Sequence, residues 1–258
     1  MTLAATADLV ASAAGTGTAV LAFNVITLEH AEAIADGTER AETAAVMQLS
    51  ENTIRFHGGR IAPLLAACAQ IATQSSAALS IHLDHFQDVA LIDEAIETAA
   101  ALGATSIMVD AAHLPYRDNV DRTRAFTARA HAAGLWVEAE LGEVGGKDGR
   151  RKDAHAPGAR TDPDEAAAFT AETEVDGLAV AVGSSHAMTT RDARLDIELI
   201  EKLAASVGGG ARVPLVLHGS SGVPDDQRRL AVHAGIRKVN VGTALNVAYT
   251  GAIRGALT

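Results

Sequence analysis

Short apolar runs alternate with longer alanine-rich segments of helical periodicity along the chain. The runs have the length of buried strands, and each is followed by a segment that reads as helix. The predicted strands span residues 19–25, 44–50, 78–84, 105–110, 135–141, 177–183, 213–218 and 236–241. The clearest predicted helices are Val89 to Ala101, Asn119 to Ala133, Pro163 to Thr173 and Pro224 to Ala234. Repeated strand–helix units favour a parallel sheet.

Eight such units in 258 residues predict an α/β fold, a closed (β/α)8 TIM barrel that forms a single domain over residues 1–258. An open doubly wound sheet is the alternative. It needs fewer strands, and no convincing G-x-G-x-x-G follows the first predicted strand. One long connection, around residues 142–162, is polar and rich in glycine. Loops of this length in compact domains are often functional, so we expect an active-site loop there.

Polar residues follow the apolar part of most predicted strands. In barrels of this kind the chemistry lies at the carboxyl ends of the strands. The polar residues at these ends are Asn24, Gln48, Ser50, Asp84, His85, Asp110, Glu138, Glu140, His186, His218 and Asn240. Three neutral imidazoles with an open fourth position are a known ligand set for catalytic zinc. A single histidine would more often be structural, but His85, His186 and His218 at equivalent positions favour a metal site.

The third predicted strand ends on the adjacent pair Asp84-His85. Neighbouring strand residues face opposite sides, so both can serve one site only if the strand turns there. We expect His85 to bind the metal and Asp84 to carry a proton beside it. The alternative is that Asp84 orients a histidine. His82, two residues earlier, is expected to point into the barrel.

Two further segments indicate phosphate binding. "HGSSG" (218–222) and "NVGT" (240–243) each precede a predicted helix. Helix N-termini with glycine and hydroxyl residues present donors to an anion, and barrel phosphate sites are often formed after strands 7 and 8. Ordinary helix capping by Ser221 and Thr243 is the alternative.

The amino-acid composition indicates which kinds of binding partner and which cellular compartment to expect. The formal net charge is −11, which argues against nucleic acid or an anionic membrane as the main partner. Hydrophobic residues make up 48 % of the chain, enough for a sizeable core. The single cysteine, Cys68, excludes an intrachain disulfide and fits a reducing compartment. With no signal-peptide pattern at the N-terminus and no apolar run of roughly 18 to 20 residues, we expect a cytoplasmic protein.

Seven stretches, in order along the chain, resemble the class II (metal-dependent) ketose-bisphosphate aldolases, in particular the tagatose-/fructose-bisphosphate aldolase branch. They are "AFNVITLEHA" (22–31), "IHLDHF" (81–86), "IMVDAAHLP" (107–115), "VEAELGEVGG" (137–146), "LAVAVGSSHA" (178–187), "PLVLHGSSGVP" (214–224) and "IRKVNVGTAL" (236–245). Each stretch alone is weak, but together they are specific.

The resemblance implies a lyase of carbohydrate metabolism that cleaves or forms a C–C bond between dihydroxyacetone phosphate and an aldehyde through a zinc-stabilised enediolate. The substrate would be a ketose 1-phosphate or 1,6-bisphosphate. By resemblance, one Zn²⁺ is held by His85, His186 and His218, and Asp84 is the proton carrier. The other positions matched are Asp110 and Glu140 for a second metal position, and Asn24, Ser50, Gly219, Ser221, Asn240 and Thr243 for substrate and phosphate. A monovalent cation and a homodimer or homotetramer are also implied.

The sequence departs from the family pattern at several places, including Ser220 in place of a common alanine and Gly242 in "NVGT". The glutamate usual in the loop after the fifth strand is missing, and Asp148 is the nearest candidate for a second proton carrier. Ala187 stands where many relatives have glycine. The chain ends at Thr258, before the longer C-terminal arm of relatives. It therefore stays open whether the aldehyde half carries a phosphate.

Two other functions are alternatives to the metal-dependent aldolase. A Schiff-base lyase on the same fold needs a buried lysine at a strand end. Lys238 is the one lysine on a predicted strand, and its depth in the barrel favours an ion pair instead. A non-catalytic sugar-phosphate-binding protein is the other alternative, against which the three histidines and Asp84 argue.

Overall fold

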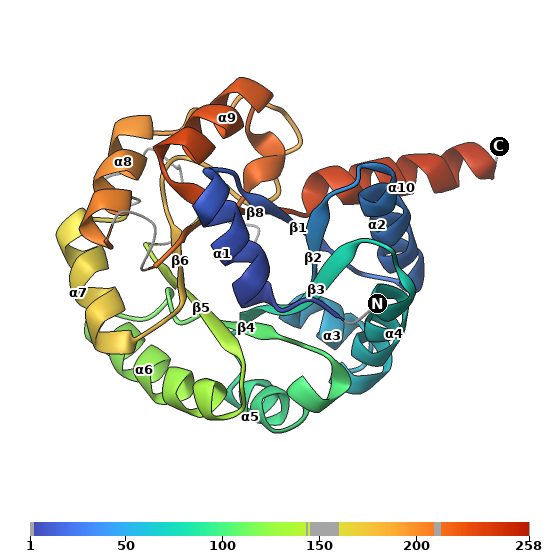
Figure 1. Cartoon of the computed structure of the whole chain (residues 1–258), viewed down its shortest axis with the longest axis horizontal. Helices are drawn as coiled ribbons and strands as arrows, with labels where there is room; N and C mark the ends of the chain where they lie inside the picture. Colours follow the sequence, from blue (N-terminus) through green and yellow to red (C-terminus); the bar gives the residue numbers. More distant parts are fainter. Residues whose placement is uncertain (1–2, 143, 145–159, 209–212, 258) are drawn as a thin grey trace.

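Eight parallel strands close into a barrel in chain order, with β8 paired to β1 (Figure 1). The computed structural model describes residues 3–142, 144, 160–208 and 213–257. The strands are β1 (Val20–Asn24), β2 (Ala44–Ser50), β3 (Ala78–Phe86), β4 (Ser106–Val109), β5 (Trp136–Leu141), β6 (Gly177–Val180), β7 (Leu215–Leu217) and β8 (Ile236–Val241). The predicted TIM barrel is confirmed.

The helices surround this barrel (Figure 1). They are α1 (Thr6–Thr16), α2 (Leu28–Arg40), α3 (Glu51–Phe56), α4 (Ile61–Gln74), α5 (Val89–Thr98), α6 (Tyr116–Ala132), α7 (Pro163–Thr173), α8 (Ile197–Ser206), α9 (Asp225–Ala234) and α10 (Thr243–Ala256), with the 3₁₀ turns η1 (Ala100–Leu102) and η2 (Ser220–Gly222). Pro163 starts α7 as predicted, where its missing N–H is not needed. Pro224 lies one residue earlier than predicted, as the N-cap of α9.

Most of the strands are buried on both faces, which explains why they read as continuous apolar runs, whereas Leu21 of β1 is exposed. Outward-facing residues such as Met47, Ile81 and Val137 pack in the main core under the helices. Two smaller apolar clusters lie apart from this core, one of Val10, Val20, Ala22 and Val46 and the other of Met108, Ala179 and Val216. Buried polar side chains, among them Ser106, Glu138 and Lys238, are also present on the strands.

Helix α1 lies across the amino-terminal end of the barrel (Figure 1). Its Val10 and Ala13 are buried, and the amide of Ala4 donates to the carbonyl of Leu79 over 2.9 Å. The first residue of α1, Thr6, is fully buried among strand hydroxyls. The end of the barrel opposite the carboxyl ends of the strands is thus covered by this helix.

Helix α10 projects away from the barrel toward the C-terminus (Figure 1). None of its described residues is buried. An apolar cavity of about 370 Å³ lies beside β1 and α2, lined by Leu21, Phe23, Ile34 and Leu245 among others. Within the described residues, no helix combines the length and the apolar character needed to cross a membrane.

Candidate metal centre and active site

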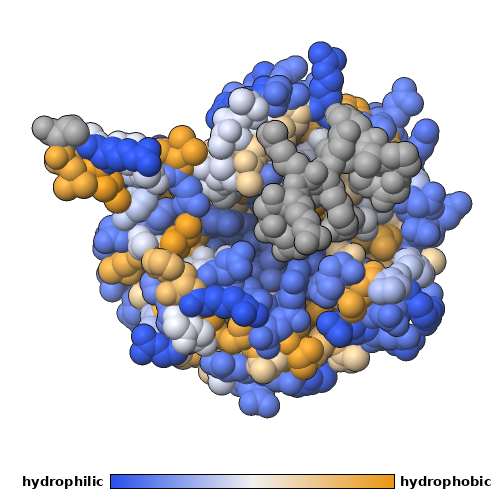
Figure 2. Space-filling view, turned by 180° about the vertical axis from the view of Figure 1, so that it is seen from behind, coloured by the Kyte–Doolittle hydropathy of each residue, from blue (hydrophilic) through white to orange (hydrophobic). Residues whose placement is uncertain are grey.

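A cavity of about 290 Å³ opens at the carboxyl ends of the strands. The side of the molecule seen in Figure 2 has a central hollow bordered by hydrophilic residues. Nine of the residues predicted from the sequence line the cavity: Asn24, Ser50, Asp84, His85, His186, Gly219, Ser221, Asn240 and Thr243. Three others, Asp110, Glu140 and His218, lie just behind its wall and contact one another or the lining histidines. The structure therefore brings together twelve of the predicted site residues.

The pair Asp84-His85 reaches the cavity because β3 is irregular there. The pairing of β3 with β4 shifts register between Leu83 and Phe86, and His85 has a φ of 54°. A residue other than glycine in this left-handed region costs on the order of 1–3 kcal/mol, and bulges of this kind are common beside active sites. The strand turns at this pair, as the sequence analysis required, although β3 runs two residues further than predicted.

The three predicted histidines face one another. Their ring centroids are 4.7 Å apart for His85 and His218, 5.1 Å for His85 and His186, and 5.8 Å for His186 and His218. One potential ligand atom from each ring and one carboxylate oxygen of Glu140 all lie within 4.8 Å of one another. Three imidazoles and a carboxylate suit zinc or a similar divalent ion. Because one ion could bridge these atoms, the residues present fit a metal site.

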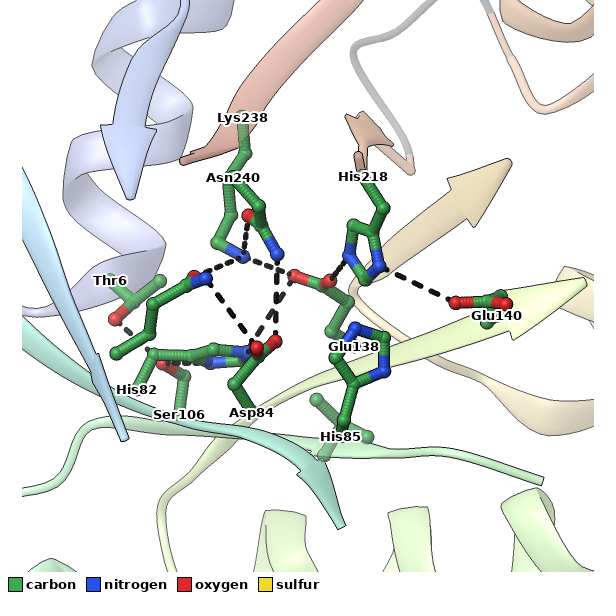
Figure 3. Close-up of polar contacts among 12 residues, drawn as sticks. Thr6, His82, Asp84, His85, Ser106, Glu138, Glu140, His218, Lys238 and Asn240 are labelled. Atoms are coloured by element: carbon green, nitrogen blue, oxygen red, sulfur yellow. Dashed lines mark hydrogen bonds and ion pairs between the residues drawn. The ribbon is translucent and has the colours of Figure 1, made fainter. Parts of the chain in front are cut away.

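Two carboxylates orient the histidine rings. Asp110 Oδ2 lies 2.8 Å from Nδ1 of His85. Glu138 Oε1 lies 2.8 Å from Nε2 of His218 (Figure 3). Such contacts fix the tautomer and leave the other ring nitrogen as a ligand. Nδ1 of His218 is buried, makes no hydrogen bond and lies 3.4 Å from Oε2 of Glu140. A buried ring nitrogen without a hydrogen-bond partner can serve as a ligand to a metal ion.

The carboxylates also control the charge on His218. Burial alone would lower the pKa of His218, but the nearby carboxylates of Glu138 and Glu140 outweigh it and raise the pKa to about 9. Burial likewise opposes the charge of Glu138, but the ammonium of Lys238 and the contact with His218 keep the pKa of Glu138 well below its usual range. In the protein without metal, the raised pKa favours the imidazolium form of His218, with both ring nitrogens protonated, at neutral pH.

Asp84 lies at the floor of the cavity with its carboxylate almost fully buried. The amides of Asn240 and Gln48 approach its two oxygens at 3.5 Å each. Burial would raise the pKa of Asp84, but the nearby His85 and His218 outweigh it, so the pKa is lowered. Asp84 is thus held as a carboxylate, which can accept a proton.

A chain of hydrogen bonds connects α1 to the underside of the site (Figure 3). The Ser106 hydroxyl donates to Oγ1 of Thr6 over 2.7 Å and lies 2.8 Å from Nδ1 of His82. Because Ser106 already donates, His82 carries its proton on Nδ1. Burial and the charge of Lys238 lower the pKa of His82 to about 3, so the ring is neutral. Its Nε2 lies 3.8 Å from Oδ1 of Asp84. His82 points into the barrel, as expected.

Lys238 is fully buried below the cavity. Its Nζ lies 2.9 Å from Oε2 of Glu138 and 2.8 Å from Oδ1 of Asn240 (Figure 3). It also lies 3.5 Å from Oε1 of Gln48. The ion pair favoured from the sequence is therefore present. An amine held by three acceptors and outside the cavity lining is poorly placed to attack a carbonyl.

The two glycine- and hydroxyl-rich segments meet at one side of the cavity. Gly219 has a φ of 64°, and an added Cβ would lie 2.6 Å from the backbone of Ser185. The Ser221 hydroxyl accepts a hydrogen bond from the amide of Ala244, 3.0 Å away in the first turn of α10. Ser221 therefore caps a helix, as the capping alternative held, but the helix is α10 and not the one that follows it in sequence. This contact joins the β7 and β8 loops.

Most of the loop predicted around residues 142–162, including Asp148, lies outside the described residues. Sequence reasoning also assigned no role to Thr6, Ser106 and Gln87. The inward face of β4, read at a period of two, contains Ser106 and could have indicated it. Thr6 carried no such signal, because its place depends on how α1 docks on the barrel.

Comparisons with known proteins show the family to which the chain belongs. A sequence model of the family described as "Fructose-bisphosphate aldolase class-II" matches residues 4–257. A crystal structure from Coccidioides immitis, of a protein assigned as a fructose-1,6-bisphosphate aldolase, is 31% identical, with a TM-score of 0.86 over 96% of this chain and 85% of that one. The YdjI aldolase from Escherichia coli K12 is 28% identical, with a TM-score of 0.83 over 98% and 86%. A fructose-bisphosphate aldolase from Campylobacter jejuni, 20% identical, shares the fold with a TM-score of 0.79 over 96% and 78%.

Proposed function

Because the chain belongs to the class-II fructose-bisphosphate aldolase family of metal-dependent lyases, we propose that it joins dihydroxyacetone phosphate to an aldehyde, and cleaves the product, at a zinc site formed by His85, His186 and His218. The observation that carries this proposal is the convergence of the three rings, with ligand atoms within 4.8 Å of one another and of Glu140. A zinc ion held there would supply Lewis acidity that stabilises negative charge on the substrate carbonyl.

Asp84 is the proposed proton carrier at the bond that breaks. Cleavage next to a ketone requires the hydroxyl on the far carbon to lose its proton as that carbon becomes an aldehyde. The Asp84 carboxylate borders the cavity and lies next to the metal ligand His85 in the β3 bulge. A positioned base of this kind contributes typically about 10²–10⁴-fold. Asp148 remains our proposal for the second proton carrier.

The phosphate of dihydroxyacetone phosphate is proposed to bind between the β7 and β8 loops. Gly219, Ser221, Gly242 and Thr243 line the cavity there, at the start of the 14-residue helix α10. The positive end of the α10 dipole favours an anion at this position. With the phosphate bound there, the ketone end of the substrate would lie between Asp84 and the three histidines. Asn24 and Asn240 then border the carbons between phosphate and aldehyde.

A homodimer is proposed from α10. In a (β/α)8 barrel the helix after β8 covers the outside of the neighbouring strands. Here α10 projects, its Val247 and Ile253 are 59% and 41% exposed, and the apolar cavity beside β1 and α2 is open. The α10 of a second copy has the apolar face that suits this cavity. The compartment proposed is the cytoplasm, in line with the free thiol of buried Cys68.

The function is tested with metal-loaded enzyme, dihydroxyacetone phosphate and a panel of aldehydes. Asp84→Asn should keep one metal ion per chain and lose roughly 10²–10⁴-fold in kcat. His218→Ala should lose the metal. His131→Ala, at an exposed histidine paired with Asp176, serves as the matched control and should change neither value. Full activity after metal removal, or stoichiometric metal in the His218 variant, would refute the proposal.

A further inference from the structure

The cavity has two chemically different ends. Strands β3 and β7 are four positions apart in the eight-stranded barrel, so their ends lie on opposite sides. The β7–β8 side presents Gly219, Ser221 and Thr243. The β2–β3 side is formed by the first turn of α3 and the residue after β3, with Ser50, Glu51, Asn52 and Gln87 among the lining residues.

The direction of the substrate follows from the proposed function, on which this inference rests. With phosphate at the β7–β8 side and Asp84 at the new hydroxyl, the carbons contributed by the aldehyde extend past β3. They therefore meet the β2–β3 wall. The chemistry of that wall decides which aldehyde is accepted.

The β2–β3 wall carries negative charge and neutral hydrogen-bonding groups. The Glu51 carboxylate accepts hydrogen bonds from the amides of Gln87 and Asp88, at 2.6 and 2.8 Å. Arg55 lies close, but its guanidinium is shared by Glu51 at 2.8 Å and Asp88 at 3.2 Å. Two carboxylates against one guanidinium leave this corner negative. Among the described residues that line the cavity, none is lysine or arginine.

Two amide side chains at this wall can bind hydroxyl groups. Asn52 is exposed at the start of α3. Gln87 is also exposed and donates from Nε2 to Asp110 over 3.1 Å, which leaves its amide oxygen as an acceptor. Amides pair with both the donor and the acceptor side of a hydroxyl, whereas a phosphate would meet the Glu51 charge.

We propose that the acceptor of this aldolase is an uncharged, hydroxylated aldehyde, so that the product is a ketose 1-phosphate and not a bisphosphate. In the condensation, C3 of dihydroxyacetone phosphate loses a proton and bonds to the aldehyde carbon. The aldehyde oxygen takes up a proton and becomes the new hydroxyl. No other reactant is required, and the proton count balances.

The test compares matched acceptors with the metal-loaded enzyme at saturating dihydroxyacetone phosphate. Glyceraldehyde is compared with glyceraldehyde 3-phosphate, and glycolaldehyde with its phosphate. We expect kcat/KM to be at least about tenfold higher for each uncharged aldehyde. Equal or higher values for the phosphorylated partners overturn the inference.

A charge placed on the wall gives a second readout. Asn52→Arg should shift the ratio of kcat/KM toward the phosphorylated acceptor by about tenfold. Gln70→Arg adds the same charge at an exposed site on α4, away from the cavity, and should leave the ratio unchanged. An unchanged ratio in the Asn52 variant counts against the wall as the specificity element.

A separate measurement distinguishes this inference from the proposed function. Exchange of the C3 proton of dihydroxyacetone phosphate with D₂O needs no aldehyde and is followed by NMR. Exchange together with a preference for phosphorylated acceptors overturns only the acceptor inference. Absence of exchange in the metal-loaded enzyme overturns the proposed function and this inference with it.

Discussion

Replacing Lys238 by methionine tests whether the charges below the site are balanced as the structure indicates. The ammonium lies 2.9 Å from Oε2 of Glu138, and both side chains are fully buried. Methionine has a similar length and no charge, so Lys238→Met keeps most of the packing and removes the cation. Glu138 is then left with His218 as its one remaining charged contact.

The expected loss of stability is large, because one charge of a buried pair loses its partner. Such changes typically cost about 3–5 kcal/mol, whereas exposed pairs contribute about 0–1 kcal/mol. The double variant Lys238→Met/Glu138→Gln removes both charges. It should therefore be less destabilised than the sum of the two single variants, by roughly 0.5–3 kcal/mol, the usual coupling between residues in contact.

The assay is urea unfolding at one fixed metal concentration, since bound metal adds to the measured stability. Arg40→Met is the matched control, because Arg40 pairs with Asp36 at 2.8 Å but the two side chains are 75% and 64% exposed. If Lys238→Met were no more destabilising than Arg40→Met, or if the two single variants were simply additive, the proposed charge balance would be wrong. Borohydride treatment with substrate should also leave Lys238 unmodified.

Three other predictions concern single residues. The pKa of His218 in the metal-free protein is raised above its ordinary value to about 9. The protonated His218 therefore stabilises the fold fully below about pH 6.5, and this stabilisation is lost as pH rises through 9. Urea unfolding of protein treated with a chelator should show this decline, and a flat stability profile between these pH values would contradict it. Gly219→Ala should destabilise by at least about 1–2 kcal/mol from its left-handed backbone alone, with a further loss from the 2.6 Å approach to Ser185, and an unchanged melting curve would disagree. Burial raises the pKa of the Cys68 thiol to about 12, so a thiol reagent should find no reactive cysteine in the native protein and one per chain after unfolding.

The barrel could be predicted because its strands are buried on both faces and separated by helical segments of regular length. The metal ligands could be proposed because His85 and His218 come directly at strand ends. The β3 strand was predicted two residues too short, since a polar pair normally marks the end of a strand and the bulge continues it. The link from Ser106 to Thr6 could not be predicted, because it depends on the docking of a helix distant in sequence.

The bulge in β3 gives Asp84 and His85 a relative placement that a regular strand does not allow. Residues i and i+2 share a face but lie about 6.6–6.8 Å apart along the strand, whereas adjacent residues have Cα atoms about 3.8 Å apart and face opposite sides. A proton carrier that must act beside a metal ligand needs the short spacing and a common face. The positive φ of His85 supplies both, because it rotates that side chain to the side of Asp84. The pairing of β2 with β3 continues through Ser50 and Asp84, so the distortion is confined to the β4 side. The strain at His85 is therefore a cost of placing proton transfer and metal binding on neighbouring residues.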